Sequence, residues 1–233
     1  GYLDYYKDKL FFVSSIGITA FAELNPDQLV FKQIENNIPS FVKVESLRKG
    51  TWFSIKDTKV FDEKIYVSYT NEIKDDCWNT SIIYADLNFE KLSFKKFFDP
   101  GECIHSKHNE DAEFNPHQSG GRIFKFDDNH IMLTTGDYRS RAKAQLTDNS
   151  FGKILKIDSR SGDYEILSMG HRNPQGLFFN KKENFLISTE NGPFGGDEIN
   201  LIDLNSKEIK NYGWAISSYG DHYPGRTEEV KKK

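Results

Sequence analysis

Three polar turns between Arg172 and Trp214 hold the residues with the clearest chemical potential. The turns read RNPQG (172–176), NGPFGGDEIN (191–200) and NYGW (211–214), and two strand-like runs separate them. Turns this rich in glycine, proline and polar residues bury little apolar surface, so they are poor candidates for the core. They bring together an arginine, two acids and several backbone carbonyls, which are groups that hold an anionic ligand and a hard cation.

Arg172 and Asn173 open the first of these turns. Pro174 stiffens the turn, and Gly176 permits a close approach to the strand that follows. An arginine fork on a rigid turn can pair bidentately with a carboxylate, although an arginine in a surface salt bridge leaves the same pattern. The turn therefore predicts an anion-binding site at Arg172 and Asn173.

Oxygen atoms suited to Ca²⁺ gather in the second and third turns. Gly192 and Pro193 offer backbone carbonyls, Asp197 and Glu198 follow closely, and Tyr212 lies in the third turn. A donor set of carboxylates and carbonyls suits Ca²⁺. An acidic turn at the edge of a sheet is the plainer interpretation, but the length of the motif favours a calcium site.

A second candidate cluster lies upstream, where His117 opens HQSGGR and Asp137 closes TTGD. A neutral imidazole is a competent general base near pH 7. In a hairpin the start of one strand lies close to the end of its partner. We therefore expect Asp137 to hydrogen-bond the His117 ring and to stabilise the imidazolium that forms. A surface-loop histidine and a turn aspartate are the alternative.

The loop before this histidine offers another interpretation, a zinc or other transition-metal site. It contains an H-x2-H spacing and several acids, at His105, His108, Glu110, Asp111, Glu113 and His117. Such histidine spacing occurs in metal sites. A solvated acidic loop is the simpler explanation of the same residues.

Strand signals dominate the elements that must position these groups. Four runs of alternating apolar or β-branched residues begin about 55–65 residues apart, which is typical of propeller blades; they cover 9–17, 64–70, 130–137 and 184–192. Five further strand-like runs lie between them, at 81–87, 121–127, 152–158, 176–180 and 199–204.

Helical periodicity is weak throughout the chain, and its best candidate, around 25–37, is short. The pattern therefore predicts an all-β, antiparallel fold, a β-propeller with about four blade-like units. We expect one domain over 1–233, with a frayed tail at 224–233.

Composition narrows the classes of function. The 233 residues are 37% hydrophobic and carry a net charge of −4, so there is a sizeable core and no basic surplus for nucleic acid. No apolar run approaches the roughly 18–20 residues of a transmembrane helix, and no signal peptide is apparent. Cys77 and Cys103 permit one disulfide in an oxidising compartment or two free thiols.

The polar motifs also occur together in a known family. HQSGGR, TTGD, AQ (144–145), RNPQG, GPFGGDEIN and NYGW stand in the order and spacing of the soluble quinoprotein glucose/sorbosone dehydrogenases, also called aldose sugar dehydrogenases. The chain resembles this family from roughly Lys64 to Tyr223. The resemblance implies a six-bladed propeller, a periplasmic or secreted location, and the cofactors pyrroloquinoline quinone (PQQ) and Ca²⁺.

Site roles follow from the same resemblance. His117 resembles the catalytic base, and Asp137 resembles the acid that positions it. Arg172 and Asn173 resemble the quinone-binding pair, and Arg172 is also expected to stabilise negative charge that develops during the reaction. Asn191 stands where relatives have glutamine or histidine in the cofactor pocket.

The implied calcium ligands lie in the later turns. The carbonyls of Gly192 and Pro193 resemble ligands of the Ca²⁺ that binds the cofactor. Asp197, Glu198 and Tyr212 resemble participants in a structural Ca²⁺ site.

The resemblance implies oxidation of an aldose sugar or similar alcohol to a lactone or carbonyl product, with hydride transfer to the quinone. The expected partners are the sugar and an external electron acceptor, with a homodimer as a candidate assembly. Two alternatives remain: a non-catalytic, calcium-stabilised propeller that binds carbohydrate or protein, and a calcium-dependent lactonase. Propellers host all three functions.

Overall fold

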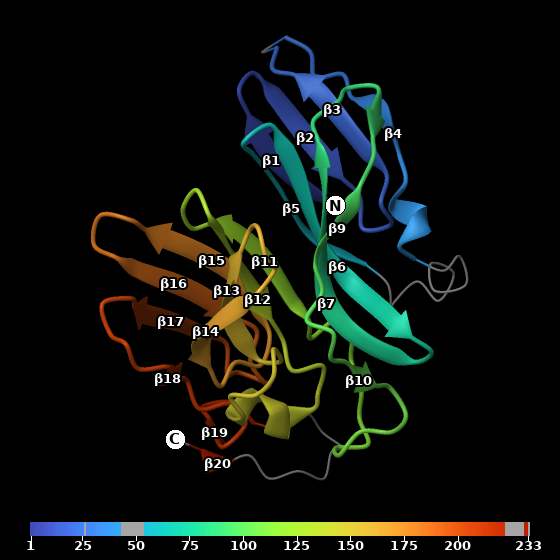
Figure 1. Ribbon diagram of the computed structural model, residues 1–233. Coiled ribbons are helices and arrows are strands. Elements are labelled where there is room, and N and C mark those ends of the chain that lie inside the picture. The colour runs from blue at the N-terminus through green and yellow to red at the C-terminus, as the bar shows by residue number, and fades with distance from the viewer. Residues whose placement is uncertain (26, 43–53, 222–230, 233) are drawn as a thin grey trace.

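The computed structural model describes residues 1–25, 27–42, 54–221 and 231–232, and within these ranges the fold is almost entirely β (Figure 1). The first sheet contains β1 (Tyr2–Tyr6), β2 (Lys9–Val13), β3 (Thr19–Glu23), β4 (Lys32–Asn36) and β8 (Lys91–Leu92). The second contains β5 (Ile55–Phe61), β6 (Lys64–Lys74), β7 (Cys77–Asp86), β9 (Lys95–Phe98) and β10 (Ile104–His105).

Two further sheets carry the turns of chemical interest. The third contains β11 (Gly120–Lys125), β12 (His130–Thr135), β13 (Lys153–Asp158), β14 (Tyr164–Met169) and β18 (Lys210–Asn211). The fourth contains β15 (Pro174–Asn180), β16 (Phe185–Glu190) and β17 (Glu198–Asp203). The remaining described elements are β19 (Ser217–Ser218), β20 (Lys231–Lys232) and the short 3₁₀ helices η1 (Ile38–Ser40) and η2 (Arg141–Gln145).

The sheets are arranged as blades around their first strands. Strand β1 contacts β5, β5 contacts β11, and β11 contacts β15, while each later strand of a sheet lies farther out (Figure 1). Strands that follow one another through tight hairpins pair antiparallel, whereas β8 pairs in parallel with β4 and β18 in parallel with β14. The predicted all-β propeller with about four blade-like units is therefore confirmed.

The inner strands of three blades are irregular near the turns that precede them. The register shifts between Ile55 and Asp57 in β5, between Gly120 and Ile123 in β11, and between Pro174 and Gly176 in β15. Such bulges bend a strand and redirect single side chains. A bulge in the inner strand thus recurs at the same end of three successive blades.

All nine expected runs contain a strand, but the helix considered at 25–37 is wrong. Residues 32–36 form β4, and Ile34 pairs with Thr19 of β3 and is buried. The apolar residues just before it, Leu29, Val30 and Phe31, are consecutive and exposed, so they form no helical stripe. In the expected tail, residues 224–230 and 233 lie outside the described ranges, and β20 pairs in parallel with β19.

Alternation along the fourth sheet separates a buried face from an open one. Leu186 and Ile202 are fully buried and pack with Met132 and Ile154 of the third sheet. On the opposite face, Leu201 is 59% exposed. Phe178 and Ile199 share that open face with Leu201 through the register of the three strands.

Lys153 is fully buried at the start of β13. Its ammonium group donates hydrogen bonds to the backbone oxygens of Lys143 at 2.9 Å, Ala144 at 3.2 Å and Phe151 at 2.5 Å. Burial lowers the pKa of Lys153 to about 8. The lysine therefore attaches η2 to the third sheet by satisfying carbonyls of the helix and the following loop.

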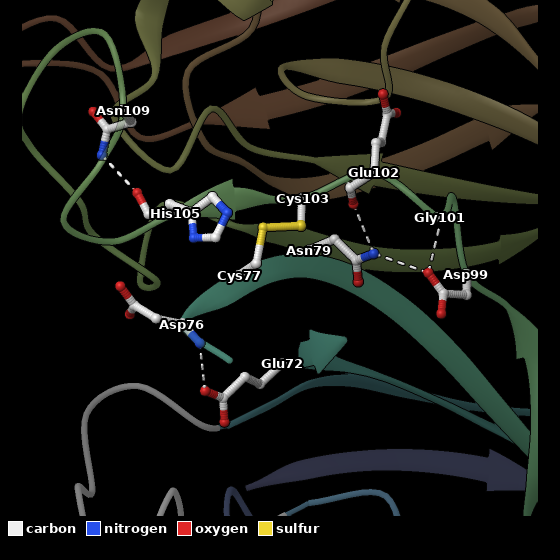
Figure 2. Close-up of a disulfide and its surroundings, with 10 residues drawn as sticks. All are labelled: Glu72, Asp76, Cys77, Asn79, Asp99, Gly101, Glu102, Cys103, His105 and Asn109. Carbon is white, nitrogen blue, oxygen red and sulfur yellow. Dashed lines mark hydrogen bonds between the residues drawn. A yellow bond between two sulfur atoms is a disulfide. The ribbon is translucent and has the colours of Figure 1, made fainter. Parts of the chain in front are cut away.

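A disulfide joins Cys77, the first residue of β7, to Cys103, just before β10 (Figure 2). Next to it, the side-chain amide of Asn79 donates to Asp99 Oδ1 and to the Glu102 carbonyl, both at 2.9 Å. The loop that leads toward His117 is thus fixed at its origin by one covalent and two hydrogen bonds. Of the two states that the sequence permits for these cysteines, the structure has the disulfide.

No helix in the described part of the chain has the length and apolar character needed to cross a membrane.

Candidate cofactor and active site

The expected site residues occupy the same end of the third and fourth sheets. His117 and Asn173 precede the inner strands β11 and β15, whereas Asp137 and Asn191 follow their partners β12 and β16. In an antiparallel pair the start of one strand lies beside the end of the next. The hairpins therefore bring both motif pairs to one edge, as the sequence suggests.

Two hydrogen bonds connect the turns of adjacent blades. The Asp137 amide donates to the Arg172 carbonyl at 3.0 Å. The Gly120 amide donates to Asn173 Oδ1, also at 3.0 Å. Asn173 is buried and its side-chain oxygen is used in this contact, so it fixes the relation between the two turns.

Arg172 is buried, and its guanidinium contacts the turn formed by residues 191–197. Nη1 donates to the carbonyls of Asn191 at 2.8 Å and Gly192 at 2.7 Å. The guanidinium carbon also lies 5.4 Å from the centre of the Trp214 ring, within cation–π range. The arginine is therefore held against this turn by hydrogen bonds, with its charge largely removed from water.

A buried network supports the backbone of this arginine. The Glu190 carboxylate accepts a short hydrogen bond from the Arg172 amide, and its other oxygen lies 2.9 Å from His171 Nδ1. His171 Nε2 lies 2.8 Å from Ser168 Oγ. All four residues are buried, so this serine–histidine–glutamate arrangement has the geometry of a positioning network and is closed to substrate.

Asp137 is fully buried and bonds to groups other than the expected histidine. Its carboxylate accepts from Trp214 Nε1 at 2.7 Å and from the Arg139 amide at 2.8 Å. With the Gln118 amide oriented to satisfy both neighbours, its nitrogen donates to Asp137 at 3.1 Å and its oxygen accepts from Arg172 Nη2 at 2.7 Å. Burial raises the pKa of Asp137 to about 6, against the lowering effect of these donors.

The expected hydrogen bond between Asp137 and the His117 ring is absent from the described structure. His117 is exposed on a turn in which its amide donates to Asn115 Oδ1 at 2.9 Å. The next residue, Gln118, is the one that reaches Asp137. Partial burial, and secondly the charge of Lys56, lower the pKa of the His117 imidazole. The ring is thus favoured in its uncharged, proton-accepting form.

The histidine-rich loop is held by arginines of the neighbouring loop. Arg141 Nη2 lies 3.1 Å from Glu113, and its backbone amide donates to Asp111 at 2.6 Å. Arg139 Nη1 lies 3.4 Å from the same Glu113 oxygen. Within the described ranges no three histidine, cysteine or acidic side chains converge on a metal-sized site. Ion pairing, rather than zinc, accounts for these two acids.

Oxygen atoms of the 191–197 turn fit the donor set of a hard cation only in part. The Gly192 carbonyl accepts from Arg172, and the Pro193 carbonyl accepts from the Gly196 amide at 2.8 Å. Asp197 Oδ1 accepts from the Gly192 amide at 2.9 Å and so closes the turn. Each carbonyl oxygen keeps a second lone pair, and every donor in the turn is an oxygen atom, as Ca²⁺ prefers. A Ca²⁺ ion would fit here only with an anion bound between it and the positive charge of Arg172.

The other two expected metal ligands have different surroundings. The Tyr212 hydroxyl donates to the Leu201 carbonyl at 2.6 Å, and its ring stacks on His171 with 5.1 Å between ring centres. Glu198 begins β17 opposite Glu190 and accepts from the Asn200 amide at 3.3 Å. These contacts direct the Tyr212 hydroxyl to a backbone carbonyl and the Glu198 carboxylate to Asn200.

Sequence reasoning missed Trp214 and Gln118 as parts of this site. Both lie inside motifs that attracted attention, NYGW and HQSGGR, but the roles of the indole and the amide depend on long-range contacts. Trp214 reaches Asp137 across 77 positions of sequence. The sequence offered one signal for them: Gln118 follows the candidate base His117, and Trp214 lies two residues after the candidate ligand Tyr212.

Comparison with known proteins connects this arrangement to a family. The model of the family described as Glucose / Sorbosone dehydrogenase matches residues 32–233. The chain belongs to this family. Among curated glucose/sorbosone dehydrogenase relatives, it is 33% identical over 119 residues to the aldose sugar dehydrogenase YliI of Escherichia coli K12, covering 46% of this chain and 31% of that protein. It is 46% identical over 92 residues to quinoprotein glucose dehydrogenase B of Acinetobacter calcoaceticus, covering 38% and 18%.

Solved structures of glucose and aldose sugar dehydrogenases share the propeller fold. The apo aldose sugar dehydrogenase of E. coli superposes with a TM-score of 0.76 at 23% identity, over 99% of this chain and 67% of that one. A PQQ-bound aldose sugar dehydrogenase from Streptomyces coelicolor gives 0.67 at 17% identity, over 96% and 63%. The family that the motifs suggested is thus confirmed, and the chain aligns with about a third or less of the curated relatives' length.

Proposed function

We propose that this chain supplies the cofactor and base side of a PQQ- and Ca²⁺-dependent dehydrogenase that oxidises an aldose sugar or similar alcohol. The observation that carries the proposal is the buried guanidinium of Arg172, held on the Asn191 and Gly192 carbonyls close to the turn that bears His117. Membership of a sugar dehydrogenase family supports it. So do the name of the quinoprotein relative and the PQQ-bound structural neighbour.

The chain's own residues divide the work. His117 accepts the proton of the sugar hydroxyl, Arg172 and Asn173 bind the anionic groups of the cofactor, and Arg172 offsets negative charge that develops there. Asp137 positions the base indirectly, through the neighbouring Gln118. When bound, the quinone supplies a two-electron acceptor and Ca²⁺ a Lewis acid. An external acceptor would take up the two electrons removed from the alcohol carbon.

The calcium assignment follows from the donor chemistry of one turn. The carbonyls of Gly192 and Pro193 would hold the ion, with Asp197 closing the turn behind them. Glu198 and Tyr212 are proposed for a separate structural ion. Because Arg172 already donates to the Gly192 carbonyl, Ca²⁺ and the anionic cofactor should bind together better than either binds alone.

The disulfide supports a periplasmic or secreted location, because such bonds persist in oxidising compartments.

The decisive experiment is a titration of PQQ into the Ca²⁺-loaded protein, followed by quinone absorbance. We expect saturable binding that weakens by roughly 10-fold or more in Arg172→Ala, because the paired charge is lost. The matched control is Arg160→Ala, since the Arg160 side chain is 79% exposed in a distant turn. Sugar-dependent bleaching should be lost in His117→Ala.

Absence of binding at tens of micromolar PQQ, with Ca²⁺ still raising the melting temperature, would contradict the dehydrogenase. That result would favour a calcium-stabilised binding module.

A further inference from the structure

Lys56 reaches the turn that carries His117 from the preceding blade. It lies at the start of β5, between Ile55 and Asp57, where the register against β6 shifts. Lys56 is therefore the extra residue of a β-bulge, and bulges redirect single side chains beside active sites.

The stem of Lys56 fits against a glycine of the next blade. Gly121 lies within the irregular stretch of β11 and has a φ of +109°. A Cβ at this position would overlap Cβ and Cγ of Lys56. The glycine thus leaves the space along which the lysine crosses from the second sheet toward the loop before the third.

The ammonium end of Lys56 holds the peptide group that precedes the histidine. Nζ donates to the Pro116 carbonyl at 3.0 Å. On the other side of the same peptide plane, the His117 amide donates to Asn115 Oδ1 at 2.9 Å. Because a peptide group is planar, holding both its oxygen and its N–H fixes the direction in which the His117 Cα leaves it.

We propose that Lys56 is a positioning residue for His117, which aims the imidazole through the Pro116 carbonyl and places a positive charge on the turn that carries it. This inference rests on the proposed function, in which His117 accepts the substrate proton. It adds a residue of the second sheet to a site formed by the third and fourth sheets.

Lys56 keeps its positive charge over the pH range in which His117 titrates. Burial lowers the pKa of Lys56 to about 8, which is still above the ordinary value for imidazole of about 6.5. The lysine is therefore protonated throughout the range in which His117 titrates. Its charge is the second cause, after burial, of the lowered pKa of His117.

Other charged groups near this turn are already paired. Glu113 of the same loop lies within salt-bridge distance of Arg139 and Arg141. Asp57, next to Lys56 in sequence, pairs with Arg122 of β11 at 2.9 Å. Lys56 is the one ionised side chain that acts directly on the imidazole within the described ranges.

The first test is an NMR pH titration of the His117 imidazole, assigned by the loss of its signal in His117→Ala. In Lys56→Met, which keeps the stem and removes the charge, we expect the titration midpoint to move upward. Lys59→Met is the matched control, because Lys59 lies on the same strand and pairs with Asp4 at 3.2 Å. An unchanged midpoint in folded Lys56→Met overturns the proposal, whether or not the protein oxidises sugars.

A kinetic test measures how much the orientation of His117 by Lys56 contributes to catalysis. In PQQ-loaded protein, kcat of Lys56→Met should fall by roughly 10- to 100-fold with little change in KM, because a misaimed base loses reactive orientation. Lys56→Arg, which keeps the charge and a donor, should restore most of kcat. If Lys56→Met does not fold, Lys56→Gln serves as the uncharged variant in both tests.

The outcomes distinguish this inference from the function on which it rests. A wild-type protein without sugar oxidation contradicts the proposed function, and the imidazole titration still decides the role of Lys56. An active wild type in which Lys56→Met and Lys56→Gln leave kcat and the His117 midpoint unchanged overturns the role of Lys56 alone.

Discussion

The side chains of Asp137 and Arg172 are buried and are linked through Gln118 and Trp214. The indole of Trp214 donates to the acid and stacks on the arginine, while Gln118 bridges them. The residue types at these positions were recognisable in the sequence. The partner of Asp137 was not, because hairpin geometry indicated only His117 and the contact with Trp214 spans 77 positions of sequence.

The raised pKa of Asp137 gives this site a pH-dependent stability. An acid whose pKa is raised in the folded state contributes stability that is present below its ordinary value near 3.8 and is lost as pH rises through about 6. Asp137→Asn removes this dependence. From about pH 4 to about pH 7, we expect the variant to gain about 3 kcal/mol in free energy of unfolding relative to wild type.

Urea unfolding at both pH values measures this change, and only the difference between them matters. Asp128→Asn is the control, because the Asp128 side chain is 96% exposed, so its stability should follow that of wild type. A constant difference between Asp137→Asn and wild type would show that folding does not raise the pKa of Asp137.

At the scale of elements, hydrophobic alternation predicted the strands with strong signals and missed those without. The run 130–137 contains β12, whose residues after His130 are all buried. Strand β1 escaped notice because its tyrosines and acid alternate between half-buried and exposed positions. The short helix considered at 25–37 failed because pairing with β3 buries Ile34 in a sheet, and this contact is not written in local periodicity.

The loop between β7 and β10 should depend on its disulfide. Cys77 and Cys103 are 26 positions apart, and closing a loop of this length stabilises a protein by about 3 kcal/mol in the chain-entropy treatment. We expect Cys77→Ala/Cys103→Ala to lose about that much in urea unfolding. Adding a reductant should destabilise the wild type and leave the double variant unchanged. Equal sensitivity of both proteins to reductant would contradict the prediction.

At the scale of the molecule, each blade buries one face against its neighbour, and the fourth sheet keeps an open apolar face. Phe178, Ile199 and Leu201 are 55%, 79% and 59% exposed on it. The sequence predicted a propeller because its repeat is long and its strands alternate. It did not indicate which apolar residues face outward, because neighbours along a strand differ only by the register of the sheet.

Adjacent residues of β17 test that register directly. Leu201→Ala should change the free energy of unfolding by less than about 0.5 kcal/mol, because the side chain is mostly exposed. Ile202→Ala should cost roughly 3 kcal/mol, because Ile202 is 1% exposed within the core between the third and fourth sheets. Urea unfolding compares the pair, and similar costs at both positions would mean that both faces of the strand are covered.

The buried ammonium of Lys153 can report local opening of the third blade. With three backbone oxygens around it and no exposed surface, this amine is closed to acylating reagents while η2 stays attached to β13. Once uncovered, the amine loses the burial that lowers its pKa, so it then reacts as a surface lysine does. The rate at which Lys153 is acylated, relative to surface lysines of the same chain, therefore reports how often η2 separates from β13.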